Sequence, residues 1–122
     1  MSVTGQPRTL VDRHEAAIDP ERRVRLGAHY TPADLATRLV RLGFTALGHV
    51  PRRVVDPSCG AGSILLAVAD ELLAAGVPVG EVPGRLVGFD LDPQAIEAAH
   101  RAIAVWRSAH DHYGGAGGPA TL

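Results

Sequence analysis

The fold of this chain is decided by residues 53–75, which read RVVDPSCGAGSILLAVADELLAA. Two β-branched valines, Val54 and Val55, favour a short buried strand that ends at a carboxylate. A proline and a glycine-rich turn follow, and they predict an exit loop. The run from residue 63 to residue 75 is helix-forming throughout and precedes Gly76, a residue suited to a left-handed helix end. The stretch therefore predicts a strand, a loop and a helix in that order.

A second unit of the same kind follows along the chain. Residues 77–84 hold two prolines and two glycines, which predicts a connector without regular structure. Residues 86–90, LVGFD, favour a second strand, and Asp92-Pro93 joins a helix cap to a proline suited to the first helical turn. An apolar stripe at helical spacing follows, at Ile96, Ala99, Ile103 and Trp106. This order predicts a right-handed parallel crossover, the opening unit of a doubly wound α/β sheet.

A further helix is expected before the first strand. Thr31 can cap it, Pro32 fits the first helical position, and Asp34 favours the positive end of the helix. Apolar residues spaced four and three apart predict its buried face, at Leu35, Leu39 and Leu42. We expect this helix to end at Gly43.

The two ends of the chain are expected to lie outside this unit. Residues 8–18 contain enough apolar positions for a short helix, which the Asp19-Pro20 pair would end. The tail after His110 is rich in glycine and lacks apolar periodicity, so we expect it to be mobile. A chain of 122 residues forms one domain at most.

Composition bounds the class of protein. The chain is 46% hydrophobic and 20% charged, which is typical of a globular domain. All twelve basic residues are arginine and the net charge is -1, so there is no global attraction to nucleic acid. No signal-peptide core or membrane-length apolar run is evident. The single cysteine, Cys59, cannot form an internal disulfide, which agrees with a reducing compartment, and we expect a cytoplasmic protein.

The glycine-rich turn is the first candidate for a binding site. Gly60 and Gly62 let the backbone approach a ligand closely, and the start of the following helix offers free amide donors. Asp90, at the end of the second strand, is placed to accept hydrogen bonds from both hydroxyls of a ribose. An ordinary tight turn and an exposed strand-end carboxylate are the alternatives. Both features at one edge of a sheet favour a crevice that binds a nucleoside.

The details of this crevice discriminate between nucleotides. A dinucleotide fingerprint requires a third glycine, where this chain has Leu65, and an acid about 20 residues on, whereas Asp90 lies 28 residues after Gly62. A phosphate-binding P-loop requires a lysine, and the chain contains none. The carboxylate of Asp56 would repel a pyrophosphate but attract an ammonium group. S-adenosylmethionine carries both an ammonium group and a ribose, so the pattern favours this cofactor.

Three separated motifs resemble the opening of the adenine-N6 DNA methyltransferases of restriction-modification systems. They are GAHYTP at residues 27–32, DPSCGAGSIL at residues 56–65 and GFDLDPQAIEAA at residues 88–99. They occur in this order in that family, and the resemblance extends from Arg25 to Trp106. It implies the front half of a class I methyltransferase, a partial Rossmann-like sheet preceded by a helix. Residues 25–107 would form the truncated cofactor-binding domain, with an arm or short helix at 1–24 and a flexible tail at 108–122.

The resemblance also implies roles for particular residues. Three residues would line the methionine end of the cofactor: Tyr30, Thr31 and Pro32. The loop around it would be formed by Asp56, Ser58, Gly60 and Gly62. Asp90 would hold the ribose, and Leu91 would lie against the adenine. Cys59 belongs to the loop in this family and has no base beside it in the sequence, so we expect no nucleophilic role. His110 and His112 flank Asp111, but no further ligand spacing completes a metal site.

The residues that perform the transfer are missing from this sequence. The family orients adenine with an Asn/Asp-Pro-Pro-Tyr/Phe motif, and these residues contain no asparagine and no Pro-Pro pair. Two parallel strands also leave open edges. We therefore expect a partner chain to supply further strands and the contact with DNA.

Other functions stay open at this stage. One alternative is a non-catalytic S-adenosylmethionine-binding module or a degenerate remnant. Another is a methyltransferase that acts on a small molecule or a protein, because a cofactor loop alone does not choose a substrate.

Overall fold

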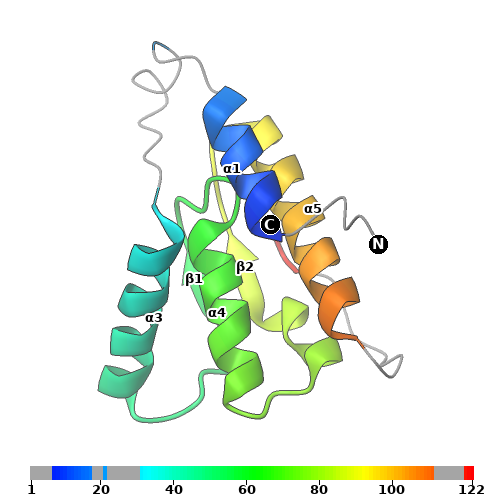
Figure 1. Ribbon diagram of the computed structural model, residues 1–122. Helices are drawn as coiled ribbons and strands as arrows, with labels where there is room; N and C mark the ends of the chain where they lie inside the picture. The colour runs from blue at the N-terminus through cyan, green and yellow to red at the C-terminus, as the bar shows by residue number, and fades with distance from the viewer. Residues whose placement is uncertain (1–6, 18–20, 22–30, 112–119) are drawn as a thin grey trace.

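The computed structural model describes residues 7–17, 21, 31–111 and 120–122 (Figure 1). The helices in these ranges are α1 (Pro7–Ala17), α3 (Ala33–Leu47), α4 (Ser63–Ala74) and α5 (Pro93–His110). The strands are β1 (Val54–Asp56) and β2 (Leu86–Gly88), and two short 3-10 helices, η1 (Val79–Glu81) and η2 (Pro83–Arg85), precede β2. No helix in the described ranges has both the length and the apolar character needed to cross a membrane.

The two strands form a small parallel sheet. Val54 pairs with Leu86, Val55 with Val87 and Asp56 with Gly88, and α4 lies in the connection between the strands. The predicted parallel unit of strand, helix and strand is therefore confirmed. β1 ends at the Asp56 carboxylate as predicted, whereas β2 is shorter than the sequence predicted, because Phe89 and Asp90 already belong to the loop that follows it.

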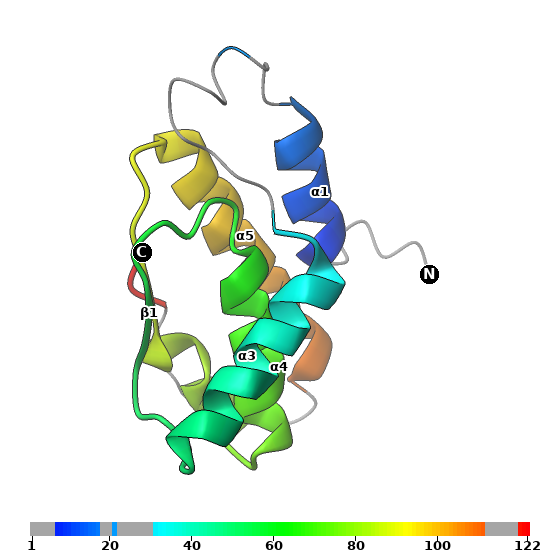
Figure 2. The same cartoon turned by 90° about the vertical axis from the view of Figure 1, so that its left-hand side faces the viewer.

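The helices that the structure describes beside this sheet lie on one of its faces. Figure 2 shows the strands along one side of the molecule, with α3, α4 and α5 on the other. Val55, whose side chain is 53% exposed, lies on the face that no described helix covers. A doubly wound sheet carries helices on both faces. The observed architecture is thus a mixed α/β fold with a helical layer on one face of a two-stranded parallel sheet.

Thr121 extends the sheet beyond β2. It forms a parallel bridge with Val87. Its carbonyl accepts a hydrogen bond from the Gly88 amide at 2.9 Å, and its amide donates to the Leu86 carbonyl at 3.0 Å. This pairing differs from the expectation of a mobile tail, of which residues 112–119 lie outside the described part of the chain. Periodicity gave no signal for it, because a single bridge needs only two backbone hydrogen bonds.

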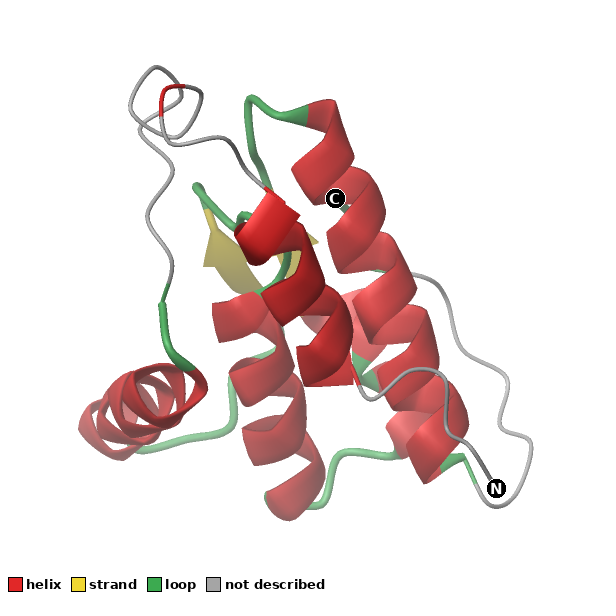
Figure 3. Ribbon diagram, turned by 45° about the horizontal axis from the view of Figure 1, so that its top comes forward, coloured by secondary structure: helices red, strands yellow, loops and turns green. Residues whose placement is uncertain are grey.

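The core is built around α4. Its apolar side chains are buried almost all round between the sheet and the neighbouring helices, and Leu65 and Leu72 are fully buried. Trp106 of α5 is also buried, and its indole Nε1 donates to Asp70 Oδ1 of α4 at 2.8 Å. Helix α1 packs against α5 and α4, with Val11 buried in the contact (Figure 3).

The predicted buried face of α3 is wrong. Its three leucines face outward and are each more than half exposed: Leu35, Leu39 and Leu42. The buried residues of α3 are Ala36 and Val40, which lie on the side that packs against α4. Smaller side chains allow the two helices to approach closely, whereas sequence spacing alone finds an apolar stripe without showing what covers it.

The ends of α3 also differ from the prediction. Pro32 occupies the N-cap position, and no side chain caps the helix, so Thr31 does not act as its cap. The helix continues through Gly43 and ends before Gly48, whose φ of 76° lies in the left-handed region. Gly43 lowers helix propensity by only about 1 kcal/mol relative to alanine, and this does not end a helix that tertiary contacts support.

The connector at residues 77–84 is more regular than predicted. Its prolines stand at the start of η1 and η2, where a residue without an amide proton loses no hydrogen bond. Val82 is fully buried between the two turns. The connector therefore contributes to the core.

Candidate functional site

The glycine-rich loop begins at the carboxyl end of β1. Asp56 Oδ1 accepts a hydrogen bond from the Ser58 amide at 3.0 Å, which turns the chain away from the strand. Gly60 and Gly62 have φ angles of 54° and 97°, in the region that side chains disfavour. Gly62 is also the N-cap of α4, and a Cβ there would lie 3.4 Å from the Ala99 side chain of α5. Both glycines are therefore required by the backbone path of the loop.

Asp90 joins the second predicted motif to this loop. Its Oδ2 accepts a hydrogen bond from the Gly60 amide at 2.9 Å, and its Oδ1 accepts from the Asp92 amide at 2.8 Å. The Asp92 side chain in turn caps α5 by accepting from the Gln94 amide at 3.0 Å. Each carboxylate oxygen of Asp90 has a second lone-pair direction, so the group can still accept hydrogen bonds from two hydroxyls.

Backbone hydrogen bonds hold the two loops together. The Phe89 amide donates to the Asp56 carbonyl at 3.0 Å, and the Cys59 amide donates to the Phe89 carbonyl at 2.8 Å. Gly88 makes this approach possible, because a Cβ there would lie 2.9 Å from both Cys59 Sγ and Leu65 Cδ1. A glycine inside a strand pattern, as at Gly88, is a sequence signal of such close approach.

The carboxylate of Asp56 lies in an unfavourable place for a negative charge. Partial burial and the nearby charge of Asp90 raise its pKa, with burial the larger cause, while the hydrogen bond from the Ser58 amide lowers it in part. Asp56 Oδ2 is buried and has no hydrogen-bond partner in the part of the chain that the structure describes. An unpaired buried acceptor of this kind favours a cationic donor.

Cys59 is a packing residue of the loop. It is buried, and burial together with the charges of Asp56 and Asp90 raises its pKa to about 12. The group is therefore a neutral thiol at ordinary pH, and a neutral thiol is a poor nucleophile.

The segment before α3 reaches the far end of the same loop. The Thr31 carbonyl accepts a hydrogen bond from Ser63 Oγ at 2.6 Å, and Ser63 Oγ accepts from Arg8 Nη1 of α1 at 2.7 Å. Thr31 is thus beside the first turn of α4, next to Gly62, and Pro32 follows as the N-cap of α3. Tyr30 lies outside the described residues.

An open cavity of about 420 Å³ lies beyond Asp90. It is lined by residues of the two loops, α5 and the chain end: Pro57, Gly88, Phe89, Asp90, Leu91, Ile96 and Leu122. Leu91 projects into solvent with 86% of its surface exposed. In the sequence, Ile96 belongs to the apolar stripe of α5, and no sequence pattern predicts a role for Leu122.

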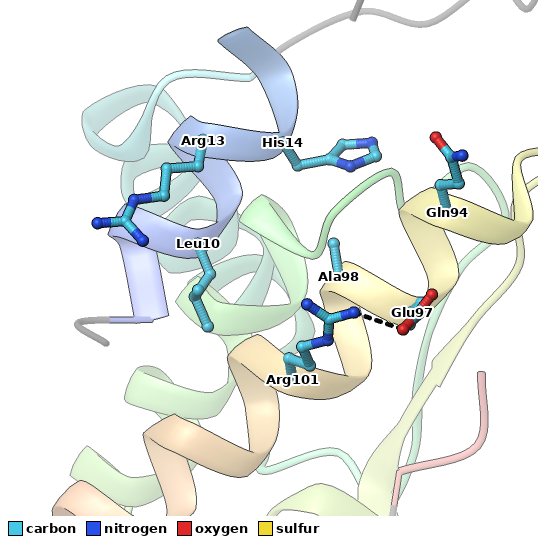
Figure 4. A pocket seen from close by; sticks show the side chains of 7 residues that line it. All are labelled: Leu10, Arg13, His14, Gln94, Glu97, Ala98 and Arg101. Atoms are coloured by element: carbon cyan, nitrogen blue, oxygen red, sulfur yellow. Dashed lines mark hydrogen bonds and ion pairs between the residues drawn. The ribbon is translucent and has the colours of Figure 1, made fainter. Parts of the chain in front are cut away.

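A second cavity, of about 410 Å³, lies between α1 and α5 (Figure 4). The His14 ring and the Arg101 guanidinium border the open space from opposite helices, and Arg101 forms an ion pair with Glu97. None of the residues that the sequence predicted for the cofactor lines this cavity. It is separate from the loop that joins Asp56 and Asp90.

The structure therefore brings most of the predicted site residues into one neighbourhood. Asp56, Ser58, Gly60 and Asp90 meet directly, and Thr31 and Gly62 stand at the start of α4. No protein-family model matches the sequence, and no solved structure matches it significantly.

Proposed function

We propose that this chain is an S-adenosylmethionine-binding segment built on the front half of a Rossmann-like class I methyltransferase fold. The class of enzyme we infer is the adenine-N6 DNA methyltransferases. One observation carries the proposal: the Gly60 amide donates to Asp90 Oδ2 at 2.9 Å, which holds the glycine-rich loop and the strand-end acid in direct contact.

The chemistry of the crevice supports a cofactor with a positive amino-acid end and a ribose. Asp56 Oδ2, buried and without a partner among the described residues, is suited to accept from the cofactor ammonium group. The remaining lone pairs of Asp90 are suited to the two ribose hydroxyls. Leu91 supplies an apolar surface for the adenine at the mouth of a cavity whose size is ordinary for a small-molecule site.

The order of the motifs supports the inferred enzyme class. The threonine of the GAHYTP segment lies at the start of α4, where its carbonyl accepts from Ser63 Oγ directly after the glycine-rich loop. In the family that the sequence resembles, this segment contacts the methionine end of the cofactor. A bound cofactor supplies a methyl group on a sulfonium, while this chain binds and orients it.

A partner chain or a further segment completes the proposed enzyme. These residues contain no Asn-Pro-Pro-Tyr motif, which would orient the adenine amine. The outer edge of β1 pairs with no described strand, and one face of the sheet carries the exposed Val55. Both surfaces are suited to pairing and packing with additional strands and helices. Contact with DNA is proposed to come through that part.

Calorimetry with S-adenosylmethionine tests the binding step. We expect saturable binding to the folded chain, and Asp90→Asn should weaken it about tenfold or more, as expected for loss of hydrogen bonds to a charged group. Glu97→Gln removes the same charge from α5 outside the crevice and should leave the affinity unchanged. A folded wild-type chain that gives no binding would contradict the proposal.

The enzymatic step has its own test. Mixing the chain with a polypeptide that carries an Asn-Pro-Pro-Tyr motif and is encoded beside it should transfer methyl groups to DNA adenine. Cofactor binding without any transfer in this mixture would favour the non-catalytic binding module, a reading that the missing motif supports.

A further inference from the structure

Helix α1 lies over the glycine-rich loop and brings a third carboxylate to it. Glu15 Oε1 is 3.7 Å from the position that a Cβ on Gly60 would occupy. The helix is fixed there by the buried Val11 and by the hydrogen bond from Arg8 to Ser63 Oγ. The same Gly60 donates its amide to Asp90, so the Glu15 and Asp90 carboxylates both lie beside this one glycine of the loop.

The place of Glu15 matches one particular group of the proposed cofactor. The ammonium group is assigned to Asp56 at the start of the loop, and the ribose is assigned to Asp90. In S-adenosylmethionine the sulfonium stands between these two ends of the molecule. The group that would face Gly60, and therefore Glu15, is the sulfonium.

Charge makes this position selective. The sulfonium carries the positive charge that the reaction removes, since the product S-adenosylhomocysteine has a neutral thioether in its place. A carboxylate a few ångströms from this position attracts the sulfonium of S-adenosylmethionine. The thioether of S-adenosylhomocysteine has no net charge for it to attract. Asp56 cannot discriminate in this way, because both ligands carry the same ammonium group.

We propose that Glu15 of α1 selects the charged cofactor over its neutral product by placing a carboxylate against the sulfonium. This inference rests on the proposed function. It assigns to α1 a role in the cofactor site that none of the three sequence motifs covers.

The test compares two ligands on one protein. Glu15→Gln should weaken S-adenosylmethionine about tenfold, the effect of one partly screened charge at short range, and leave S-adenosylhomocysteine unchanged. Glu15→Asp keeps the charge and should retain most of the preference. Glu97→Gln, which removes a carboxylate that lines the neighbouring α1–α5 cavity, should leave the ratio of the two dissociation constants as in the wild type.

A second charged ligand tests the same carboxylate. Sinefungin carries an amine in place of the sulfonium, so it should resemble S-adenosylmethionine and lose affinity in Glu15→Gln to the same extent. Circular dichroism of each variant verifies that α1 and the other helices are retained.

The outcomes separate the two proposals. If Glu15→Gln leaves the ratio of the dissociation constants of S-adenosylmethionine and S-adenosylhomocysteine unchanged, the role of Glu15 is overturned. Cofactor binding as such would then still stand. A wild-type chain that binds none of the three ligands would overturn the proposed function itself and this inference with it.

Discussion

Helices α3 and α4 lie side by side and are both rich in leucine, yet they serve the fold differently. α4 buries residues on nearly every side, whereas α3 buries only Ala36 and Val40. The leucines of α4 form the core, while those of α3 project outward beside the open edge of the sheet. Apolar periodicity thus marks surfaces that require a partner, and within the described part of the chain the leucines of α4 are covered while Leu35, Leu39 and Leu42 of α3 are not. We expect the proposed partner chain to cover the outer face of α3.

The largest expected contrast comes from shortening one leucine on each helix. Leu65→Ala on α4 removes a fully buried side chain and should lower the free energy of unfolding by about 2–5 kcal/mol. Leu39→Ala on α3, where the side chain is 52% exposed, should change it by less than about 0.5 kcal/mol. Urea denaturation followed by circular dichroism measures both values. Similar losses in the two variants would show that α3 is covered in solution.

Two glycine substitutions compare the packed interior with the exposed face of α3. Gly88→Ala would place a methyl group against Cys59 and Leu65 and should cost about 1–3 kcal/mol. Gly43→Ala meets no atom within 4 Å in the middle of α3 and should stabilise the chain by up to about 1 kcal/mol. Thermal denaturation of the two variants gives the sign of each effect. A destabilised Gly43→Ala would contradict the open environment of this face.

Burial of the Asp56 carboxylate, in the loop before α4, should lower the stability of the unliganded protein at neutral pH. Because the folded protein raises the pKa of Asp56 above 3.8, the folded state binds this proton more tightly than the unfolded state. Its contribution to stability is present at low pH and is lost as the pH rises from 3.8 through the raised value. Asp56→Asn should therefore stabilise the unliganded protein above this window and weaken binding of S-adenosylmethionine.

Melting temperatures measured from pH 3 to pH 8 test the stability effect, and calorimetry tests the binding effect. Asp34→Asn is a suitable control, because Asp34 is an exposed carboxylate in the first turn of α3. A wild-type advantage over Asp56→Asn at neutral pH without ligand would refute the assigned sign.

The smallest effect is expected where the two helices meet at the surface. Arg41 Nε of α3 donates to Glu71 Oε1 of α4 at 2.7 Å, but the arginine side chain is 68% exposed. A double-mutant cycle with Arg41→Ala and Glu71→Ala should give a coupling energy of about 0.2–1 kcal/mol, which falls as salt is added. A larger, salt-independent coupling would mean that this pair, rather than the buried Ala36 and Val40, determines how α3 docks.

The sequence predicted the parallel unit because several local signals agreed there. The valines of β1, the glycines of the loop and the long helix-forming run of α4 all favour the observed conformation. The proximity of Gly60 and Asp90 could also be predicted from the sequence, because parallel strands bring their carboxyl ends to one edge of a sheet.

What the sequence did not predict depends on contacts between distant residues. The outward leucines of α3 follow from the tight packing of Ala36 on α4, which no spacing rule encodes. The bridge of Thr121 and the place of Leu122 beside the cavity depend on backbone hydrogen bonds to β2. The position of Glu15 over Gly60 likewise results from the docking of a whole helix.

The buried Trp106 has a practical consequence. It is the sole tryptophan of the chain, so the fluorescence emission excited at long ultraviolet wavelengths comes from one indole. That indole is held by Asp70 of α4 and stacks on His110 with ring centroids 4.6 Å apart. Its emission maximum therefore reports whether α5 remains docked on α4. The chain thus carries a built-in optical probe of its own core.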